Sequence, residues 1–225
     1  MKKQIIKHAL LALASVGIAS VAHAQAAGTW FVGVGATEIS PNVSSGDLSS
    51  PSAPGTKIDV RSDTQPTAWV RYMLTDAWSV EVPIGLGFKH EIVGAGAISG
   101  SGKIATVKAL PITAFLQYNF LDKASRFRPY AMLGVTYAHF YGARGSAALN
   151  GMNPANPPSG TDLSVDSKWG VATGVGVTFA VTDKWYVDAQ YARTFLKTTT
   201  HLSTGQTIST KLDPDEFRVG LAYRF

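Results

Sequence analysis

The last nine residues of the chain, Phe217-Arg218-Val219-Gly220-Leu221-Ala222-Tyr223-Arg224-Phe225, alternate between apolar residues at odd positions and small or charged residues at even positions. A period of two is typical of a β-strand with one apolar face, and the large residues are of the aromatic and branched types that strands prefer. A soluble protein rarely ends in so apolar a strand with a free carboxylate at its tip. The pattern therefore favours a bacterial outer-membrane barrel.

The amino-terminal residues have the pattern of a secretory signal peptide. Three lysines precede an apolar stretch over residues 9–22, and Ala22-His23-Ala24 is a small-x-small cleavage site. We predict a cleaved signal peptide over residues 1–24 and a single barrel domain over 25–225. A retained membrane anchor is the alternative, and the short apolar stretch disfavours it.

Charge and cysteine content narrow the function classes. Removing the three leader lysines leaves 17 basic residues against 15 acidic ones, so no nucleic-acid partner is expected. The chain has no cysteine, which excludes disulfides and thiolate chemistry.

Eight segments with alternating apolar residues follow the leader. No other apolar run approaches the ~18 residues of a membrane helix, so a chain that enters the membrane without one must do so as a closed barrel. Long connections (39–65, 89–108, 142–167 and 197–212) take turns with short ones (75–77, 121–126 and 181–184). This pattern predicts an all-β, eight-stranded antiparallel transmembrane β-barrel of up-and-down topology, with four long extracellular loops and three short periplasmic turns. The segments are 28–38, 66–74, 78–88, 109–120, 127–141, 168–180, 185–196 and 213–225.

Aromatic pairs ten residues apart predict which face of each strand meets lipid. An even spacing keeps both members on one face, and ten residues tilted by ~40° rise about 25 Å, the height of an apolar band between two aromatic girdles. The pairs are Trp78/Phe88, Phe127/Tyr137, Trp169/Phe179 and Trp185/Phe195.

The same parity predicts the contents of the barrel. Five charged residues fall on inward positions: Arg71, Glu81, Asp188, Arg218 and Arg224. Arg193 is an exception and faces outward. Arg71 is predicted to lie opposite Glu81, either as a structural ion pair or as part of a polar constriction in a pore. Eight strands leave an interior just wide enough for side chains, which excludes a wide porin.

Many inward positions are glycine, and this has two interpretations. The glycines either leave open a narrow lumen for small solutes, or they make room for bulky side chains on neighbouring strands. The candidate lumen-lining residues are Trp69, Phe115, Met132, Gly170, Gly174, Gly176 and Tyr186.

Several motifs together resemble the OmpW family of outer-membrane proteins over residues 65 to 225. They are Phe88-Lys89-His90, Ile104 to Pro111, Phe127-Arg128-Pro129-Tyr130, Asp166 to Gly170, Leu212-Asp213-Pro214 and Tyr223-Arg224-Phe225. The resemblance implies a narrow, mostly hydrophobic lumen that passes small hydrophobic compounds, with an exit sideways through the wall. It also implies a bulky apolar gate, for which Trp69 and Met132 are candidates. One position that carries an inward aromatic in the family is Ala192 here.

The terminal Phe225, together with Tyr223, also resembles the signal that the barrel-assembly machinery of the outer membrane recognises. The expected partners are that machinery, outer-membrane lipid and small hydrophobic solutes, and the expected state is a monomer because closure leaves no free strand edge.

Other function classes fit the residues less well. An enzyme would need a nucleophile and a base, but no Gly-x-Ser-x-Gly motif occurs, and His90, His139 and His201 are too scattered to suggest a metal site. We expect no enzymatic activity, cofactor or metal. The main rival is a plugged barrel that acts as an anchor, adhesin or receptor through its loops. A soluble lipocalin-like barrel is disfavoured because it would not carry tryptophans outward and charges inward.

Overall fold

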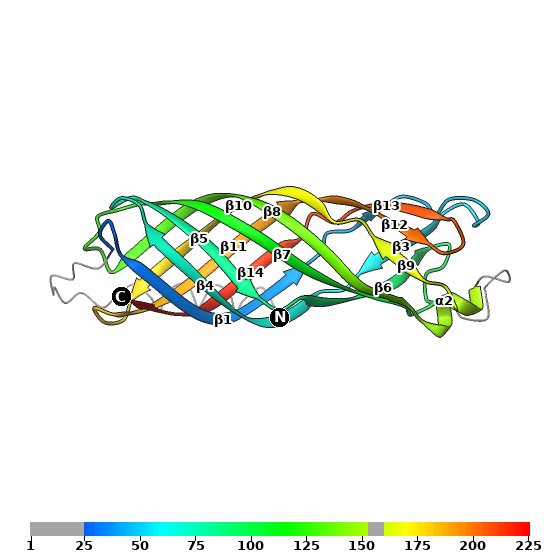
Figure 1. Cartoon of the computed structure of the whole chain (residues 1–225), viewed down its shortest axis with the longest axis horizontal. Helices are drawn as coiled ribbons and strands as arrows, with labels where there is room; N and C mark the ends of the chain where they lie inside the picture. Colours follow the sequence, from blue (N-terminus) through cyan, green and yellow to red (C-terminus); the bar gives the residue numbers. More distant parts are fainter. Residues whose placement is uncertain (1–24, 153–159) are drawn as a thin grey trace, which may run out of the picture.

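A computed structural model describes residues 25–152 and 160–225 of the protein. The predicted signal peptide and the Pro154–Pro158 segment lie outside the described residues. Within them, no helix is long and apolar enough to cross a membrane. The described chain forms a long closed cylinder of antiparallel strands (Figure 1).

The wall consists of eight strand paths in chain order, closed where the first strand pairs with the last. One path is divided into β5 and β6. The wall strands are β1 (Trp30–Ser40), β4 (Asp63–Met73), β5 (Trp78–Gly85) with β6 (Phe88–Gly96), β7 (Lys103–Asn119), β8 (Phe127–Gly145), β10 (Lys168–Ala180), β11 (Trp185–Phe195) and β14 (Asp215–Arg224). The remaining elements are β2 (Ser44–Ser45), β3 (Thr56–Val60), α2 (Ala147–Met152), β9 (Leu163–Val165), β12 (Lys197–Leu202) and β13 (Thr207–Lys211).

The topology confirms the predicted eight-stranded up-and-down barrel. Short turns connect the strands at the end where the carboxyl terminus lies, and the longer connections lie at the opposite, extracellular end (Figure 1). In two of these turns a threonine hydroxyl accepts backbone hydrogen bonds: Thr75 from Trp78 at 2.9 Å and Thr182 from Trp185 at 3.0 Å. This shared turn fixes the register of both hairpins.

The long connections differ from the expected irregular loops. The β6–β7 hairpin occupies most of 89–108, and β2, β13, β12 and β9 form a second, four-stranded sheet. Residues of β3, β6 and β7 bury an apolar cluster that includes Ile92, Ile104 and Val107. Side-chain alternation continues in these segments, so the wall extends outward beyond the predicted band.

The outward face agrees with the predicted girdle except at one residue. Trp78, Trp169 and Trp185 are exposed, as is the terminal Phe225. Phe88, however, is buried and packs beside His90, so the prediction that it faces lipid is wrong. The strand is interrupted at Leu86 and Gly87, between β5 and β6. The register with β7 shifts by one residue across this break, which reverses the facing of the side chains from Phe88 until a second shift after Ile92.

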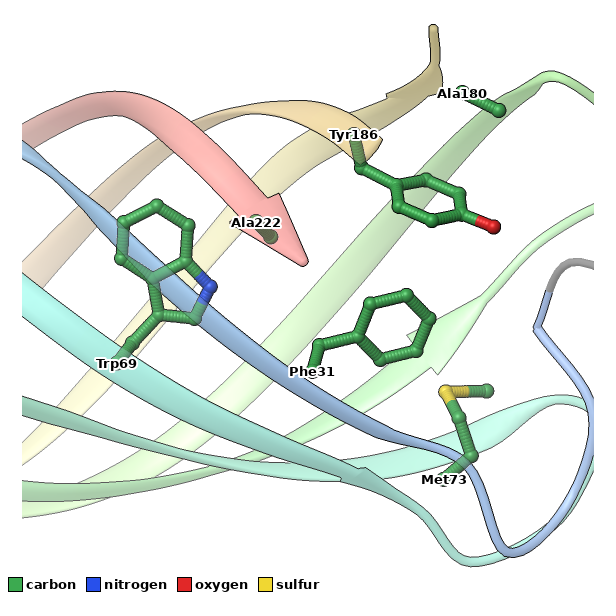
Figure 2. Packing of buried hydrophobic residues seen from close by; sticks show 6 residues of the cluster. All are labelled: Phe31, Trp69, Met73, Ala180, Tyr186 and Ala222. Carbon is green, nitrogen blue, oxygen red and sulfur yellow. The ribbon is translucent and has the colours of Figure 1, made fainter. Parts of the chain in front are cut away.

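Large side chains fill the periplasmic half of the barrel. Figure 2 shows Phe31 between Tyr186 and Met73, with Trp69 further along the barrel. A Cβ atom at Gly33 would collide with the Trp69 ring, and one at Gly176 would collide with Tyr130. Gly174 has the same relation to Met132. These glycines therefore make room for neighbouring side chains and leave no open lumen at their positions.

Candidate functional site

Four buried charged residues from four strands form an ion cluster across the middle of the barrel. The Arg71 guanidinium donates to Glu81 Oε2 at 2.7 Å and to Asp188 Oδ2 at 2.8 Å. The Arg218 guanidinium lies 3.0 Å from Asp188 Oδ1 and 2.8 Å from Glu81 Oε1. Two guanidinium groups thus meet two carboxylates, and the cluster is neutral overall.

Polar and aromatic neighbours complete the ion cluster. Thr178 accepts from Arg71 at 2.9 Å, and Gln190 accepts from Arg218 at 2.7 Å. The Arg218 guanidinium lies 4.0 Å from the centroid of the Trp69 ring, in cation–π geometry. Because all four charges are buried and paired, each one depends on the others for stabilisation.

Four of the five predicted network residues therefore contact one another in the ion cluster. Arg224, the fifth, is not part of it. Arg224 lies beside Tyr186 near the periplasmic rim, and its backbone N–H donates to Lys184 O at 2.9 Å. Six strand residues, about 20 Å, separate it from Arg218 along β14. Parity correctly put Arg224 on the inward face, but inward direction carries no information about depth.

The periplasmic end is closed by a further arginine. Arg128 donates to Gln25 Oε1 at 3.0 Å and to Asp76 O at 2.6 Å, and both Arg128 and Gln25 are fully buried. Next to this contact, Asp76 accepts from the backbone N–H of Ala27 at 2.9 Å. The first described residues are thereby held across this end of the barrel.

The extracellular half is hollow and apolar. An outer cavity of about 500 Å³ is lined mainly by aliphatic side chains, among them Leu48, Ile98, Ile104, Leu163 and Ile208. A narrower neck of about 70 Å³ lies next to it and shares Ile58, Ile92 and Thr200 with its lining. No charged residue lines the outer cavity within the part of the chain that the structure describes.

The order of residues along β11 relates the hollow half to the closed one. Tyr186 belongs to the periplasmic aromatic cluster, Asp188 to the ion cluster, and Ala192 packs with Met132 and Phe115. Leu196, at the strand's outer end, lines the neck. The neck therefore lies on the extracellular side of the ion cluster.

A small fissure of about 20 Å³ penetrates the wall beside the neck. Its lining combines inward residues such as Thr67 and Thr113 with the outward residues Ile84 and Leu86. Here β5 pairs with β7 only up to Glu81, and pairing resumes at Phe88. Pro83 and Pro111 lie in the interval, and neither can donate a backbone hydrogen bond. The sequence thus weakens this seam of the wall.

The seven predicted lumen-lining residues do not line these cavities. Trp69 and Tyr186 pack in the periplasmic half, whereas Phe115 and Met132 pack with Ala172 and Ala192. Gly174 and Gly176 are covered by Met132 and Tyr130, and Gly170 lies against the backbone of Phe195. The tertiary structure filled these positions because each glycine adjoins a large residue on the next strand.

Two candidate functional residues, Glu216 and Tyr130, were not predicted from the sequence. Glu216 lines both the neck and the fissure, and extending the alternation of the last strand by one step would have placed it inside. Tyr130 donates to Asp188 Oδ1 at 3.1 Å, but its motif gave no sign of this contact. Sequence alone could not reveal it, because the partner is 58 residues away.

The three histidines remain apart in the structure. His90 lines the neck in the extracellular extension, and its Nδ1 lies 2.8 Å from Arg61 O. Burial lowers the pKa of His90, which favours the neutral ring. His139 contacts Ser167, and His201 lies 3.3 Å from Asp166. Among the described residues no group of three or more His, Cys, Asp or Glu side chains is placed to hold a metal ion.

Comparison with known proteins agrees with this geometry. The OmpW family model matches residues 26–225. The chain belongs to the OmpW family. The present chain is 33% identical to outer membrane protein W of Salmonella typhi, and the alignment covers both chains completely. As in that family, its place is the bacterial outer membrane.

Solved structures show the same barrel. The crystal structure of OprG from Pseudomonas aeruginosa has a TM-score of 0.80 at 27% identity, covering 90% of this OmpW-family chain and 98% of OprG. The NMR structure of Escherichia coli outer membrane protein W has a TM-score of 0.57 at 29% identity, covering 89% of this chain and 99% of that one. The similarity extends over nearly the whole barrel.

Proposed function

We propose that this barrel admits small apolar molecules through the outer cavity and releases them sideways into the membrane through the seam between β5 and β7. One observation carries the proposal: the apolar cavity lies in the extracellular half, and the wall beside its neck is interrupted. Ile39, Pro111 and Glu216 line both the neck and the fissure, so the two spaces adjoin.

The ion cluster supports a sideways exit over an axial one. An apolar molecule moving along the axis would have to separate buried charges, and breaking such a pair costs roughly 3–5 kcal/mol. It offers no compensating hydrogen bonds. A sideways exit leads instead from an apolar neck to apolar lipid, and no charge pair has to open.

The fissure is too small for a solute in the closed wall, since 20 Å³ holds about one water molecule. Passage therefore requires the seam to widen. The missing ladder pairs reduce the cost of such widening, because residues 82–87 and 110–114 have few mutual backbone hydrogen bonds to break.

Cross-linking the seam tests this route. The chain has no native cysteine, so Leu86→Cys with Leu110→Cys introduces a single thiol pair on the outward side of the fissure. Cells that express this variant are treated with a short thiol cross-linker, and entry of the neutral probe N-phenyl-1-naphthylamine is followed by its fluorescence. We expect cross-linking to abolish the probe entry that the untreated variant supports.

The matched control is Val177→Cys with Ala189→Cys, a register pair on the closed β10–β11 seam. Cross-linking there should leave probe entry unchanged. Equal entry before and after cross-linking at the β5–β7 seam would overturn the sideways route, and entry no higher than in cells lacking the protein would overturn transport altogether.

A plugged barrel that acts through its extracellular end is the second candidate. The ion cluster and the ordered outer sheet of β2, β13, β12 and β9 support it. The same uptake measurement separates the two functions, because an anchor or receptor would give no probe entry above background.

A further inference from the structure

The neck contains one carboxylate without a direct side-chain partner among the described residues. Glu216 is the single acidic residue in the lining of the neck and the fissure, and His90 is the one other titratable side chain there. No hydrogen bond or ion pair joins the Glu216 carboxylate to another described residue. Its surroundings include Ile39, Leu196 and Pro214, which are apolar.

Arg218 of the ion cluster attracts this carboxylate without contacting it. Arg218 lies two residues further along the same face of β14, and its guanidinium contacts Glu81 and Asp188. Together with Arg71, the ion cluster balances two guanidinium groups against two carboxylates. Glu216 is therefore a third carboxylate, and ionising it leaves this part of the interior with one net negative charge.

A charged residue inside a membrane barrel is costly unless it finds a partner, so its presence points to a function. A membrane-embedded carboxylate in an apolar cavity is complementary to a molecule with one positive charge and an apolar body. The shapes agree, because the neck has room for a slender chain and the outer cavity beyond it is larger.

The residues in register with Glu216 on the next two strands are small. Glu216 is in register with Ala192 on β11, and Ala192 is in turn in register with Gly174 on β10. Side chains at such cross-strand positions lie about 5 Å apart. Met132 and Phe115 pack beside these small residues, so the carboxylate is approached from the neck, which Glu216 lines.

We propose that the neck is a binding site for amphiphilic cations, with an ammonium group against the Glu216 carboxylate and an aliphatic chain in the neck and outer cavity. This site deepens the proposed function by naming a preferred class of solute, and it rests on that function only for the route by which the solute leaves.

Binding of n-octylammonium and n-octanol compares a charged and a neutral probe of nearly the same shape. The protein, with labelled isoleucine methyl groups, is held in nanodiscs of zwitterionic lipid and titrated by NMR. Ile39 and Ile58 report on the neck, whereas the outward Ile112 reports on probes that merely dissolve in the lipid.

We expect Glu216→Gln to weaken n-octylammonium binding at Ile39 and Ile58 by about tenfold or more, as for loss of a charge-assisted hydrogen bond. Binding of n-octanol should be unchanged. The matched control is Glu91→Gln, at a carboxylate in the extracellular extension that pairs with Lys103 at 3.2 Å, and it should affect neither probe.

Equal n-octylammonium affinity in the parent protein and Glu216→Gln would overturn the cation site. If n-octanol still binds in that case, the apolar cavity and the proposed transport survive. If neither probe shifts Ile39 or Ile58, the cavity is not a solute site, and the proposed function fails as well. Unchanged heat-modifiable migration on gels verifies that the Glu216→Gln barrel is folded.

Discussion

The two halves of the barrel interior, one lined by the eight wall strands and the other largely by the segments that extend them, have opposite contents. From the periplasmic end to the centre, Trp69 and Tyr130 fill the space beside glycines, and the ion cluster closes the centre. In the extracellular half, aliphatic side chains surround a cavity of about 500 Å³. A glycine at an inward position therefore does not by itself create a lumen. The size of the side chain beside it on the neighbouring strand determines whether the space is filled.

The two halves are also expected to differ in rigidity. Buried charges and aromatic side chains give the closed half its rigidity, because each charge loses its stabilisation when a partner moves. The cavity of the hollow half is lined by no charged residue in the described part of the chain, so no buried ion pair crosses it. Its weakest seam, at Pro83 and Pro111, lies where the two halves meet.

The largest expected effect comes from damage to the ion cluster. Asp188→Asn keeps the size of the side chain but removes the charge of one of the two carboxylates that Arg71 and Arg218 share. We expect a loss of about 3–5 kcal/mol in the free energy of unfolding, measured by urea titration in lipid vesicles with tryptophan fluorescence.

Asp47→Asn is the comparison on the exposed outer end. Asp47 lies 3.9 Å from Lys57, and their side chains are 48% and 47% exposed. Removal of such a pair should cost less than about 1 kcal/mol. Similar losses in the two variants would contradict the division into a rigid half and a hollow half.

An intermediate effect should follow from filling the neck. Ala138 is buried and lines it, so Ala138→Phe should lower entry of N-phenyl-1-naphthylamine into cells toward the background without the protein, while the barrel still folds. Ala114→Phe places the same group on the outward face of β7 and should leave entry unchanged. Entry that is insensitive to Ala138→Phe would show that the solute path bypasses the neck.

The smallest effect concerns the periplasmic turn. Asp76 accepts from Lys123 Nζ at 2.7 Å, and this contact, with a smaller contribution from the Ala27 N–H, lowers the pKa of Asp76. The folded-state pKa lies below the unfolded value, so the ionised form stabilises the fold above the unfolded pKa, and this stability is lost as pH falls through the folded pKa. We expect a slight drop in the melting temperature of Asp76→Asn at about pH 7 that disappears near pH 2.

Because Asp76 is exposed, salt should reduce this difference as well. A melting-temperature difference between Asp76→Asn and the parent protein that persists at acid pH would mean that the turn depends on the shape of the side chain and not on its charge.

Much of the fold was predictable because strand alternation is a local property of the chain. Trp78, Trp169 and Trp185 face outward as predicted, and Arg71 lies opposite Glu81 as the short turn requires. Phe88 was mispredicted because a break of two residues between β5 and β6 shifts the register. Pro83 and the nearby glycines were visible in the sequence, but their effect on pairing with β7 was not.

The candidate site was less predictable. Parity identified Asp188 and Arg218 as inward, but the closing of the ion cluster depends on strands far apart in the chain. The long connections also concealed the outer cavity, since their Ser, Gly and Pro content is typical of loops although much of them continues the strands.

Sequence patterns were sufficient to predict an outer-membrane barrel and the lipid-facing side of most strands. The period of two and the placement of turns are local properties of the chain. The position of each inward residue along the barrel axis and the neighbour that it contacts are given only by the tertiary structure. Those two properties depend on the register between strands, and they are what close the barrel at Asp188 and leave it open beside Glu216.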